Sequence, residues 1–203
     1  MPKTQQPRSV IHQEIVWPTP YWHTIIEDFR KHETRVTFNE DMEGWVSGQM
    51  SKKKTVIKSN RGGWQSELQK PDDTFNPLVQ KINEVCKNIN LDVKEMFVPQ
   101  LWVNVNKRGD WNTIHQHGGQ YNLSGTYYVK VPKDSGRIVF RDPRPAAIGN
   151  VFTSNRFDKG EFKNINIIDG LLMLWPSYLD HFVEPSQTDE ERISISFDVI
   201  VTK

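Results

Sequence analysis

Residues 192–201 read R-I-S-I-S-F-D-V-I-V, and the alternation of polar and apolar residues, strict from 192 to 199, is the strongest fold signal in the chain. Successive side chains of a β-strand point to opposite faces. One face is therefore apolar, and the other carries Arg192, Ser194, Ser196 and Asp198. We expect the apolar face to pack against a helix and the polar face to look into the mouth of a barrel.

Further short strands precede this one. Extended segments are predicted at residues 101–105, 123–131, 137–140, 162–168 and 171–175, with Gly, Pro, Asp and Asn between them. Many short strands without interleaved helices indicate an antiparallel barrel or jelly roll. The expected fold is thus mainly β.

The N-terminal half gives weaker signals, apart from one helix at residues 74–90. Its apolar stripe recurs at helical spacing, and Pro77 is tolerated in a first turn; the stripe comprises Phe75, Leu78, Ile82, Val85 and Ile89. We also predict a strand at residues 11–17, a short helix at 21–31, and loop with one or two short strands at 33–66. The sequence predicts a single domain, with residues 1–97 as a helical and loop layer outside a core formed by residues 98–203.

Composition excludes several classes of function. The 203 residues carry 26 basic and 25 acidic side chains, which argues against nucleic-acid binding. The basic run at residues 52–54 is interpreted as a solvated loop. The single cysteine, Cys86, fits a reducing compartment, and no signal peptide or membrane span is visible, so a cytoplasmic protein is expected.

Three histidines form the candidate metal site. His115 and His117 stand two apart, so their side chains point the same way from an extended backbone, and His181 follows the apolar run that ends at Trp175. Imidazole is a common ligand of iron, zinc and copper. We interpret the three as a metal centre with open coordination positions; the alternative is surface or core histidines.

Arg192, eleven residues after His181, predicts a bound carboxylate near the metal. A guanidinium pairs with a carboxylate in a bidentate manner, and Ser194 can add a third hydrogen bond. The alternative is an ion pair with Asp180 or Glu184. Other strand residues that could complete the pocket are Asn104, Ser124, Thr126 and Tyr128, and Trp111 and Trp175 are assigned to core packing first and substrate stacking second.

Taken together, the runs HQHGGQYNLSGTYYVKVP (115–132), DPRP (142–145), LLMLWPSYLDHFVEPS (171–186) and ERISISFDV (191–199) resemble the 2-oxoglutarate/Fe(II)-dependent oxygenase superfamily. The resemblance is closest to a branch with HxH, SGxYYV, DPR, WPSxxxH and RxSxSF segments. It covers residues 98–201, and VWPTPYW (16–22) and GWQSEL (63–68) are similar to that branch with less specificity.

This resemblance implies a double-stranded β-helix, with Fe(II) in its mouth and with 2-oxoglutarate and O2 as cosubstrates. By the same resemblance His115, His117 and His181 would bind iron, and Arg192 would pair with the distal carboxylate of 2-oxoglutarate, helped by Ser194. Tyr128 and, as a weaker match, Asn104 would also contact the cosubstrate. The implied reaction is hydroxylation of a substrate with release of succinate and CO2.

The chain departs from the family pattern at His117, where the family usually has a carboxylate. A centre with three His ligands is the preferred interpretation, and an acid from elsewhere, Asp110 or Asp142, is the alternative. Two other functions stay open. One is a cupin-like three-His metal dioxygenase that does not use 2-oxoglutarate, and the other is a non-catalytic jelly-roll binding domain.

The sequence leaves the substrate undetermined between a peptide side chain, a nucleobase and a small metabolite. The connection at residues 141–160 is long enough to serve as a lid or a substrate-contacting loop, with a plain surface loop as the equal alternative. It contains Asp142, Arg144, Arg156 and Asp158. A homodimer through the helical layer is compatible with the sequence.

Overall fold

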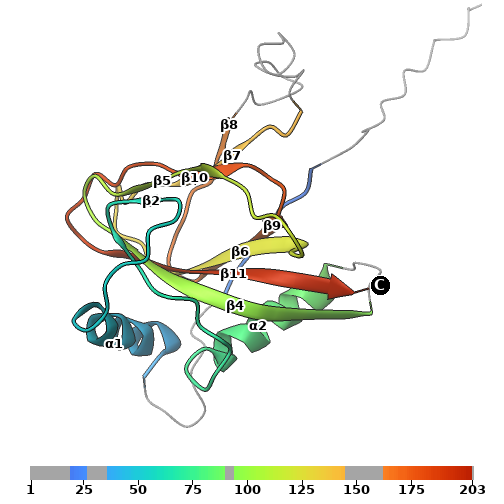
Figure 1. Ribbon diagram of the computed structural model, residues 1–203, viewed down its shortest axis with the longest axis horizontal. Coiled ribbons are helices and arrows are strands. Elements are labelled where there is room, and N and C mark those ends of the chain that lie inside the picture. Colours follow the sequence, from blue (N-terminus) through green and yellow to red (C-terminus); the bar gives the residue numbers. More distant parts are fainter. Residues whose placement is uncertain (1–18, 27–35, 90–93, 145–161, 203) are drawn as a thin grey trace, which may run out of the picture.

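Two antiparallel sheets face each other, and two helices cover the outside of the larger one (Figure 1). The computed structural model describes residues 19–26, 36–89, 94–144 and 162–202. The larger sheet has the order β1 (Trp22–Ile25), β9 (Leu171–Pro176), β6 (Leu123–Lys130), β11 (Arg192–Thr202), β4 (Glu95–Asn106) and β3 (Trp64–Gln65). The smaller sheet has the order β2 (Asn60–Arg61), β5 (Trp111–His115), β10 (His181–Val183), β7 (Ile138–Arg141) and β8 (Phe162–Asn164). The mainly β, jelly-roll fold expected from the sequence is confirmed.

Strand β11 lies at the centre of the larger sheet, between β4 and β6. Its pairing places Phe197 opposite Gly125 of β6. A Cβ atom at Gly125 would lie 2.3 Å from the Phe197 ring and 2.6 Å from the Met173 carbonyl oxygen, so no larger residue fits there. The glycine of the SGTYY run therefore lets the Phe197 ring pack closely against strand β6.

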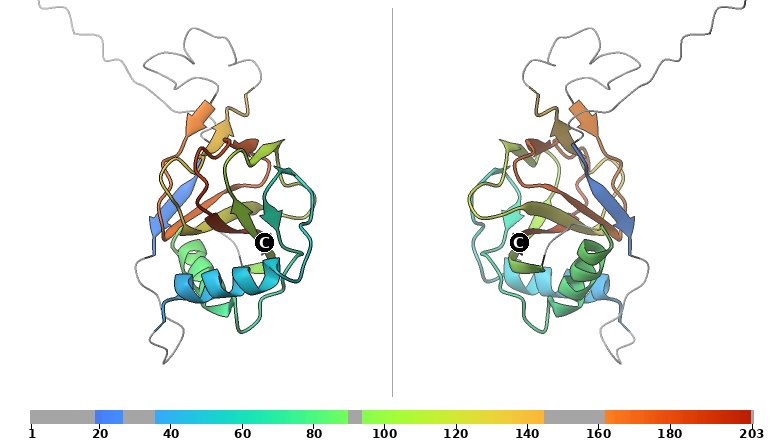
Figure 2. Two further views of the ribbon diagram at one scale, coloured as in Figure 1. Left: turned by 90° about the vertical axis from the view of Figure 1, so that its left-hand side faces the viewer. Right: turned by 90° about the vertical axis from the view of Figure 1, so that its right-hand side faces the viewer.

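Helices α1 (Phe38–Met50) and α2 (Asn76–Asn88) pack on the outer, apolar face of the larger sheet (Figure 2). Leu78 and Ile82 of α2 are fully buried in the same cluster as Ile195 and Phe197 of β11, which confirms the predicted packing. The third buried residue of α2 is Cys86, whereas Val85 of the predicted stripe is only partly buried.

Two predictions for the N-terminal half are wrong. Residues 33–66 contain α1 as well as the short strands β2 and β3, and α1 begins at a capping box in which Thr37 and Glu40 bond each other's backbone N–H groups. Residues 22–25 form β1 rather than a helix, because they pair with β9 of the larger sheet. The strand predicted at residues 11–17 lies outside the described residues.

Other boundaries shift by a few residues. The helix predicted at residues 74–90 runs from Asn76 to Asn88, and the strand predicted at 162–168 ends at Asn164. In the long connection, Asp142 and Arg144 form an ion pair with 2.6 Å between Oδ2 and Nη2, and Arg156 and Asp158 lie outside the described residues. Neither described helix is long and apolar enough to span a membrane.

Candidate metal centre

The smaller sheet and the turn after β5 bring the three predicted histidines together. His115 ends β5 and is the direct antiparallel partner of His181, which begins β10. His117 lies two residues beyond β5, where its backbone N–H donates to the Ser177 carbonyl oxygen at 2.9 Å. The ring centroids are 4.3 Å apart for His115 and His181, and 5.4 and 5.2 Å apart for His117 and each of the other two.

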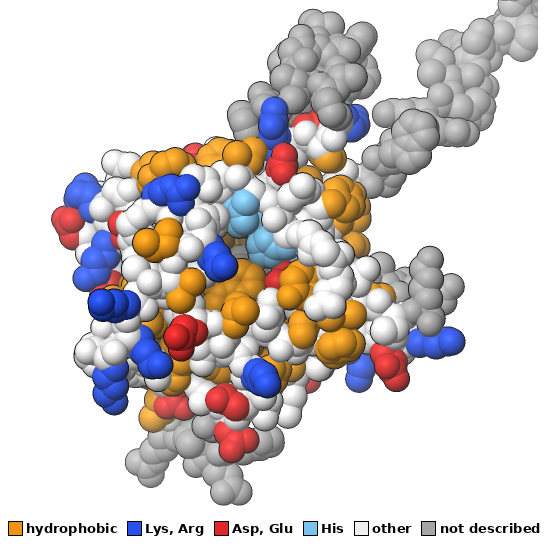
Figure 3. Space-filling model, in the orientation of Figure 1, with side chains coloured by type: hydrophobic (Ala, Val, Ile, Leu, Met, Phe, Trp, Pro, Cys, Tyr) orange, Lys and Arg blue, Asp and Glu red, His pale blue; other side chains and the backbone are white. Residues whose placement is uncertain are grey.

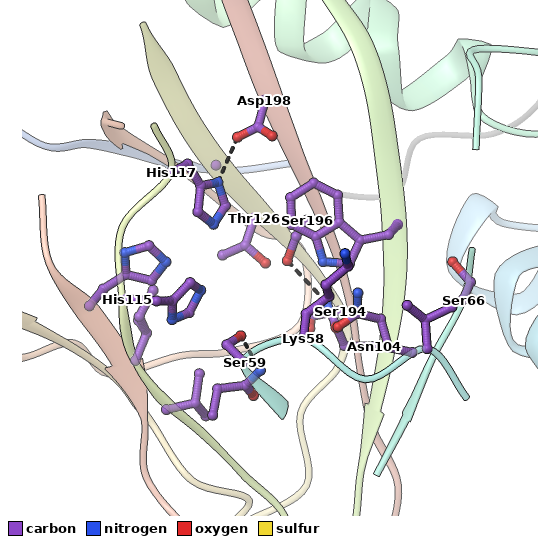
Figure 4. A pocket seen from close by; sticks show the side chains of 18 of the residues that line it. Lys58, Ser59, Ser66, Asn104, His115, His117, Thr126, Ser194, Ser196 and Asp198 are labelled. Atoms are coloured by element: carbon purple, nitrogen blue, oxygen red, sulfur yellow. Dashed lines mark hydrogen bonds and ion pairs between the residues drawn. The ribbon is translucent and has the colours of Figure 1, made fainter. Parts of the chain in front are cut away.

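Each imidazole is oriented by an acceptor behind its Nδ1 atom. His115 Nδ1 lies 2.7 Å from the Thr113 carbonyl oxygen, and His181 Nδ1 lies 2.9 Å from the Leu179 carbonyl oxygen. His117 Nδ1 lies 2.6 Å from Asp198 Oδ1 (Figure 4). Carbonyl and carboxylate oxygens only accept, so each Nδ1 carries a hydrogen, and in the neutral ring Nε2 then keeps its lone pair. The potential ligand atoms of the three lie within 4.8 Å of one another, so the donor set fits a metal ion bound by three Nε2 atoms.

Burial favours the neutral form that a metal requires. Burial, with the nearby His115 adding to it, lowers the pKa of His181 to about 3. Burial also lowers the pKa of His115, and the backbone bond to Thr113 opposes that shift. Both rings are therefore able to bind a cation at neutral pH without first losing a proton.

The two acids weighed as alternative ligands are engaged elsewhere. Asp110 accepts the Lys107 backbone N–H at 2.8 Å, and Asp142 is paired with Arg144. Among the described residues, the group able to hold a metal consists of the three histidines and includes no carboxylate.

Arg192 is buried at the end of β11, with 2% of its surface exposed. Its guanidinium donates to Asn106 Oδ1 at 2.7 Å and to the Gly136 carbonyl oxygen at 2.9 Å. Within the described part of the chain, Nε has no hydrogen-bond partner. Neither acid proposed as a partner is paired with it, and Glu184 instead binds Arg137 at 2.9 Å. A buried guanidinium without an acidic partner favours a bound anion.

Four of the remaining predicted residues, Asn104, Thr126, Tyr128 and Ser194, line the same cavity of about 790 Å³ as Arg192 and the histidines, whereas Ser124 lies behind His117 and does not line it. Tyr128 is buried, and burial raises the pKa of its phenol to about 12, while Arg192 opposes that shift. Ser194 stands between Tyr128 and Asn104 in the register of the sheet. Asn104 Nδ2 donates to Ser196 Oγ at 3.1 Å, so part of its hydrogen-bonding capacity is already used.

Several residues of the site had no role assigned from the sequence. Asp198 supports His117, and Asn106 holds Arg192. For Asp198, the sequence offered one signal of a role in the site, which is its position on the polar face of the last strand. Lys58 and Ser59 lie at the edge of the pocket away from Asp198 (Figure 4), in a segment without strong periodicity.

The two tryptophans that flank the histidine segments in the sequence lie in different environments. Trp175 is buried, lines the cavity and meets the His181 ring edge-on at 5.0 Å, whereas Trp111 is 38% exposed and does not line it. Histidine side chains are visible from outside as a pale-blue area in a hollow of the surface (Figure 3).

Comparison with known proteins gives one family and a consistent fold. The family described as putative 2OG-Fe(II) oxygenase matches residues 100–198. A prolyl-4-hydroxylase from Pseudomonas putida superposes with a TM-score of 0.62, at 12% identity over 91% of this chain and 94% of that one. The α-ketoglutarate-dependent epimerase SnoN from nogalamycin biosynthesis superposes with a TM-score of 0.64, at 13% identity over 90% of this chain and 76% of that one.

A third solved structure is the viral collagen prolyl hydroxylase from Paramecium bursaria Chlorella virus-1, with a TM-score of 0.57 at 12% identity over 90% of this chain and 96% of that one. No curated protein shows significant sequence similarity to the chain. The structural matches are too distant in sequence to carry more than the fold. The family match spans the three histidines and Arg192, and this similarity to 2OG-Fe(II) oxygenases indicates that the chain is an oxidoreductase.

Proposed function

We propose that His115, His117 and His181 bind Fe(II) through their Nε2 atoms, in a centre with three protein ligands and open positions for cosubstrate. The observation that carries this assignment is the orientation of the three rings. Each Nδ1 is tied to a fixed acceptor, so that all three free lone pairs belong to Nε2. Two of the rings are held neutral by burial.

We further propose that Arg192 binds the distal carboxylate of 2-oxoglutarate, with Tyr128 and Ser194 beside it. The free Nε of the buried guanidinium and the neutral phenol of Tyr128 both suit a carboxylate oxygen. Asn106 and the Gly136 carbonyl hold the guanidinium in place before any ligand arrives. Asn104 is assigned a smaller part, because it already donates to Ser196.

When bound, Fe(II) with 2-oxoglutarate and O2 supplies an oxidative decarboxylation that yields succinate, CO2 and a hydroxylated substrate. The chain's own part is to orient the cosubstrate through Arg192, to fix the three imidazoles, and to keep water from the buried side of the cavity, which Tyr128, Ile138 and Trp175 line.

The substrate is proposed to be a small molecule or a peptide side chain. The volume of about 790 Å³ lies within the range of small-molecule sites. The cavity is bordered by Ile57 and Leu68, two exposed apolar residues, and by Lys58. A substrate with an apolar part would therefore gain contacts on entry. Nucleic acid as a partner is disfavoured by the balanced charge.

A cytoplasmic location and a homodimer are retained as predictions from the sequence. Cys86 is a free thiol, and burial raises its pKa to about 11, so it is an unreactive core residue of the kind that needs no oxidising compartment. Sedimentation velocity would test the homodimer.

The test is an anaerobic titration of the purified chain with Fe(II) and then with 2-oxoglutarate, followed by visible absorption. We expect a weak charge-transfer band that requires both additions. His181→Ala should lose the band because iron is not bound, and Arg192→Ala should lose it while still binding iron. A cupin-like dioxygenase would bind iron but give no band with 2-oxoglutarate, and a non-catalytic binding domain would bind no iron.

A further inference from the structure

Asp198 is a buried acid directly behind one of the proposed ligands. Its side chain is 3% exposed, and Oδ1 lies 2.6 Å from His117 Nδ1. The same oxygen accepts the Ser124 hydroxyl at 2.9 Å, and Ser124 Oγ in turn lies 2.9 Å from Ser177 Oγ. Figure 4 shows Asp198 on the side of His117 that faces away from His115.

The sheet fixes the position of this carboxylate on both sides. Asp198 is paired with Gln100 of β4 and with Ser124 of β6. Ser124 is completely buried, so water does not compete with its hydroxyl for Asp198 Oδ1. Oδ1 thus accepts from two donors, the His117 Nδ1–H and the Ser124 hydroxyl.

The net charge of the proposed iron centre gives a reason for an acid at position 198. Fe(II) with three neutral imidazoles carries two positive charges, whereas the usual set of two His and one carboxylate leaves one. A carboxylate beyond the far nitrogen of a ligating His raises the basicity of that ligand and fixes its tautomer. A hydroxyl or an amide at position 198 could accept the same hydrogen bond but could not supply a negative charge.

We propose that Asp198 is a positioning residue that supplies, through His117, the negative charge that a carboxylate ligand supplies directly in related centres. The chain would then keep the net charge of the usual centre although its ligands are all neutral. This inference rests on the proposed role of His117 as a ligand.

The test compares Asp198→Asn with Ser124→Ala. The first keeps an acceptor for His117 and removes the charge; the second removes a hydrogen bond and keeps the charge. Two quantities are measured: the Fe(II) dissociation constant by anaerobic titration and the Fe(III)/Fe(II) midpoint potential by electrochemistry. Circular dichroism and thermal melting confirm that each variant is folded.

We expect Asp198→Asn to weaken Fe(II) binding by about 10- to 100-fold, the usual effect of losing such a partner. The midpoint potential should rise, because a lost negative charge disfavours Fe(III) more than Fe(II). Ser124→Ala should change both quantities less. An unchanged potential in folded Asp198→Asn overturns the proposal, even if affinity falls.

A double-mutant cycle adds an independent check. His117→Glu places a carboxylate at the ligand position, and a second negative charge beside it is then repulsive. In that background Asp198→Asn should cost no affinity, whereas an equal loss in both backgrounds would show that Asp198 acts by packing alone. If instead the wild-type chain binds no iron, or His117→Ala binds it normally, the ligand assignment fails before Asp198 is tested.

Discussion

His115 and His181 are direct partners across β5 and β10, with ring centroids 4.3 Å apart. The antiparallel register therefore sets the spacing of two of the proposed ligands, and the turn after β5 adds His117. The backbone carbonyls of Thr113 and Leu179 orient the paired rings from within the same chain segments. Most of the site's geometry is thus set by the register of the sheet.

The first prediction concerns the ligands. His115→Ala, His117→Ala and His181→Ala should each abolish Fe(II) binding and leave the fold intact, since the larger sheet and its helices bury a separate core. Isothermal titration with Fe(II) under nitrogen measures the loss, and His23→Ala, at an exposed position of β1, is the matched control. If His117→Ala keeps full affinity while Asp110→Ala or Asp142→Ala loses it, the three-His assignment is wrong.

A second prediction concerns pH and the stability of the metal-free protein. His181 has a folded-state pKa of about 3, below its ordinary value of 6.5. The unfolded chain therefore binds a proton between these values that the folded chain does not, and the free energy of unfolding falls as pH decreases through that range. One such group contributes up to about 1.4 kcal/mol per pH unit, or about 2 kcal/mol between pH 6.5 and 5.

Urea denaturation at a series of pH values measures this slope. His181→Gln should flatten it, and His23→Gln should leave it unchanged. A slope that His181→Gln does not alter would mean that other groups govern acid stability.

The third prediction tests the packing of α2. Leu78 is fully buried between the helix and the larger sheet, so Leu78→Ala should lower the free energy of unfolding by about 2–5 kcal/mol. Leu68 is 59% exposed, and Leu68→Ala should change it by no more than about 0.5 kcal/mol. Chemical denaturation of both variants gives the comparison; equal losses would contradict the assigned core.

Period-two alternation and helical spacing identified the core strands and α2, because those elements bury one face against a large partner. Arg192, Ser194 and Asp198 were placed on the cavity side by the same argument. The alternation alone does not distinguish the individual roles of these polar residues. Asp198 became a candidate only when β11 was seen to place its carboxylate behind His117.

The N-terminal errors have different causes. Residues 22–25 form a strand only through pairing with β9, which no local pattern records. Helix α1 has two glycines, Gly44 and Gly48, and a weak apolar stripe, so its periodicity was hidden. Thr37 and Glu40 form the capping box that marks its start, and that signal was present in the sequence but not used.

The last prediction concerns Arg192, the residue that separates a 2-oxoglutarate oxygenase from a cupin-like dioxygenase. Its free Nε and its anchors on Asn106 and Gly136 present a fixed fork to the cavity. Removing one partner of a buried charge pair costs about 2–5 kcal/mol. Arg192→Ala should therefore raise the 2-oxoglutarate dissociation constant by roughly 30-fold or more.

Arg192→Lys should fall between Arg192→Ala and wild type, because the ammonium keeps the charge and loses the planar fork. Arg137→Lys is the matched control, since Arg137 is a half-exposed arginine that pairs with Glu184 outside the His cavity. Two titrations decide the result, iron alone and then 2-oxoglutarate on the iron-loaded protein. Iron affinity should stay close to wild type in Arg192→Ala, because Arg192 is not among the clustered ligand residues. Binding of 2-oxoglutarate by Arg192→Ala as tight as wild type would remove the assignment of Arg192 to the cosubstrate.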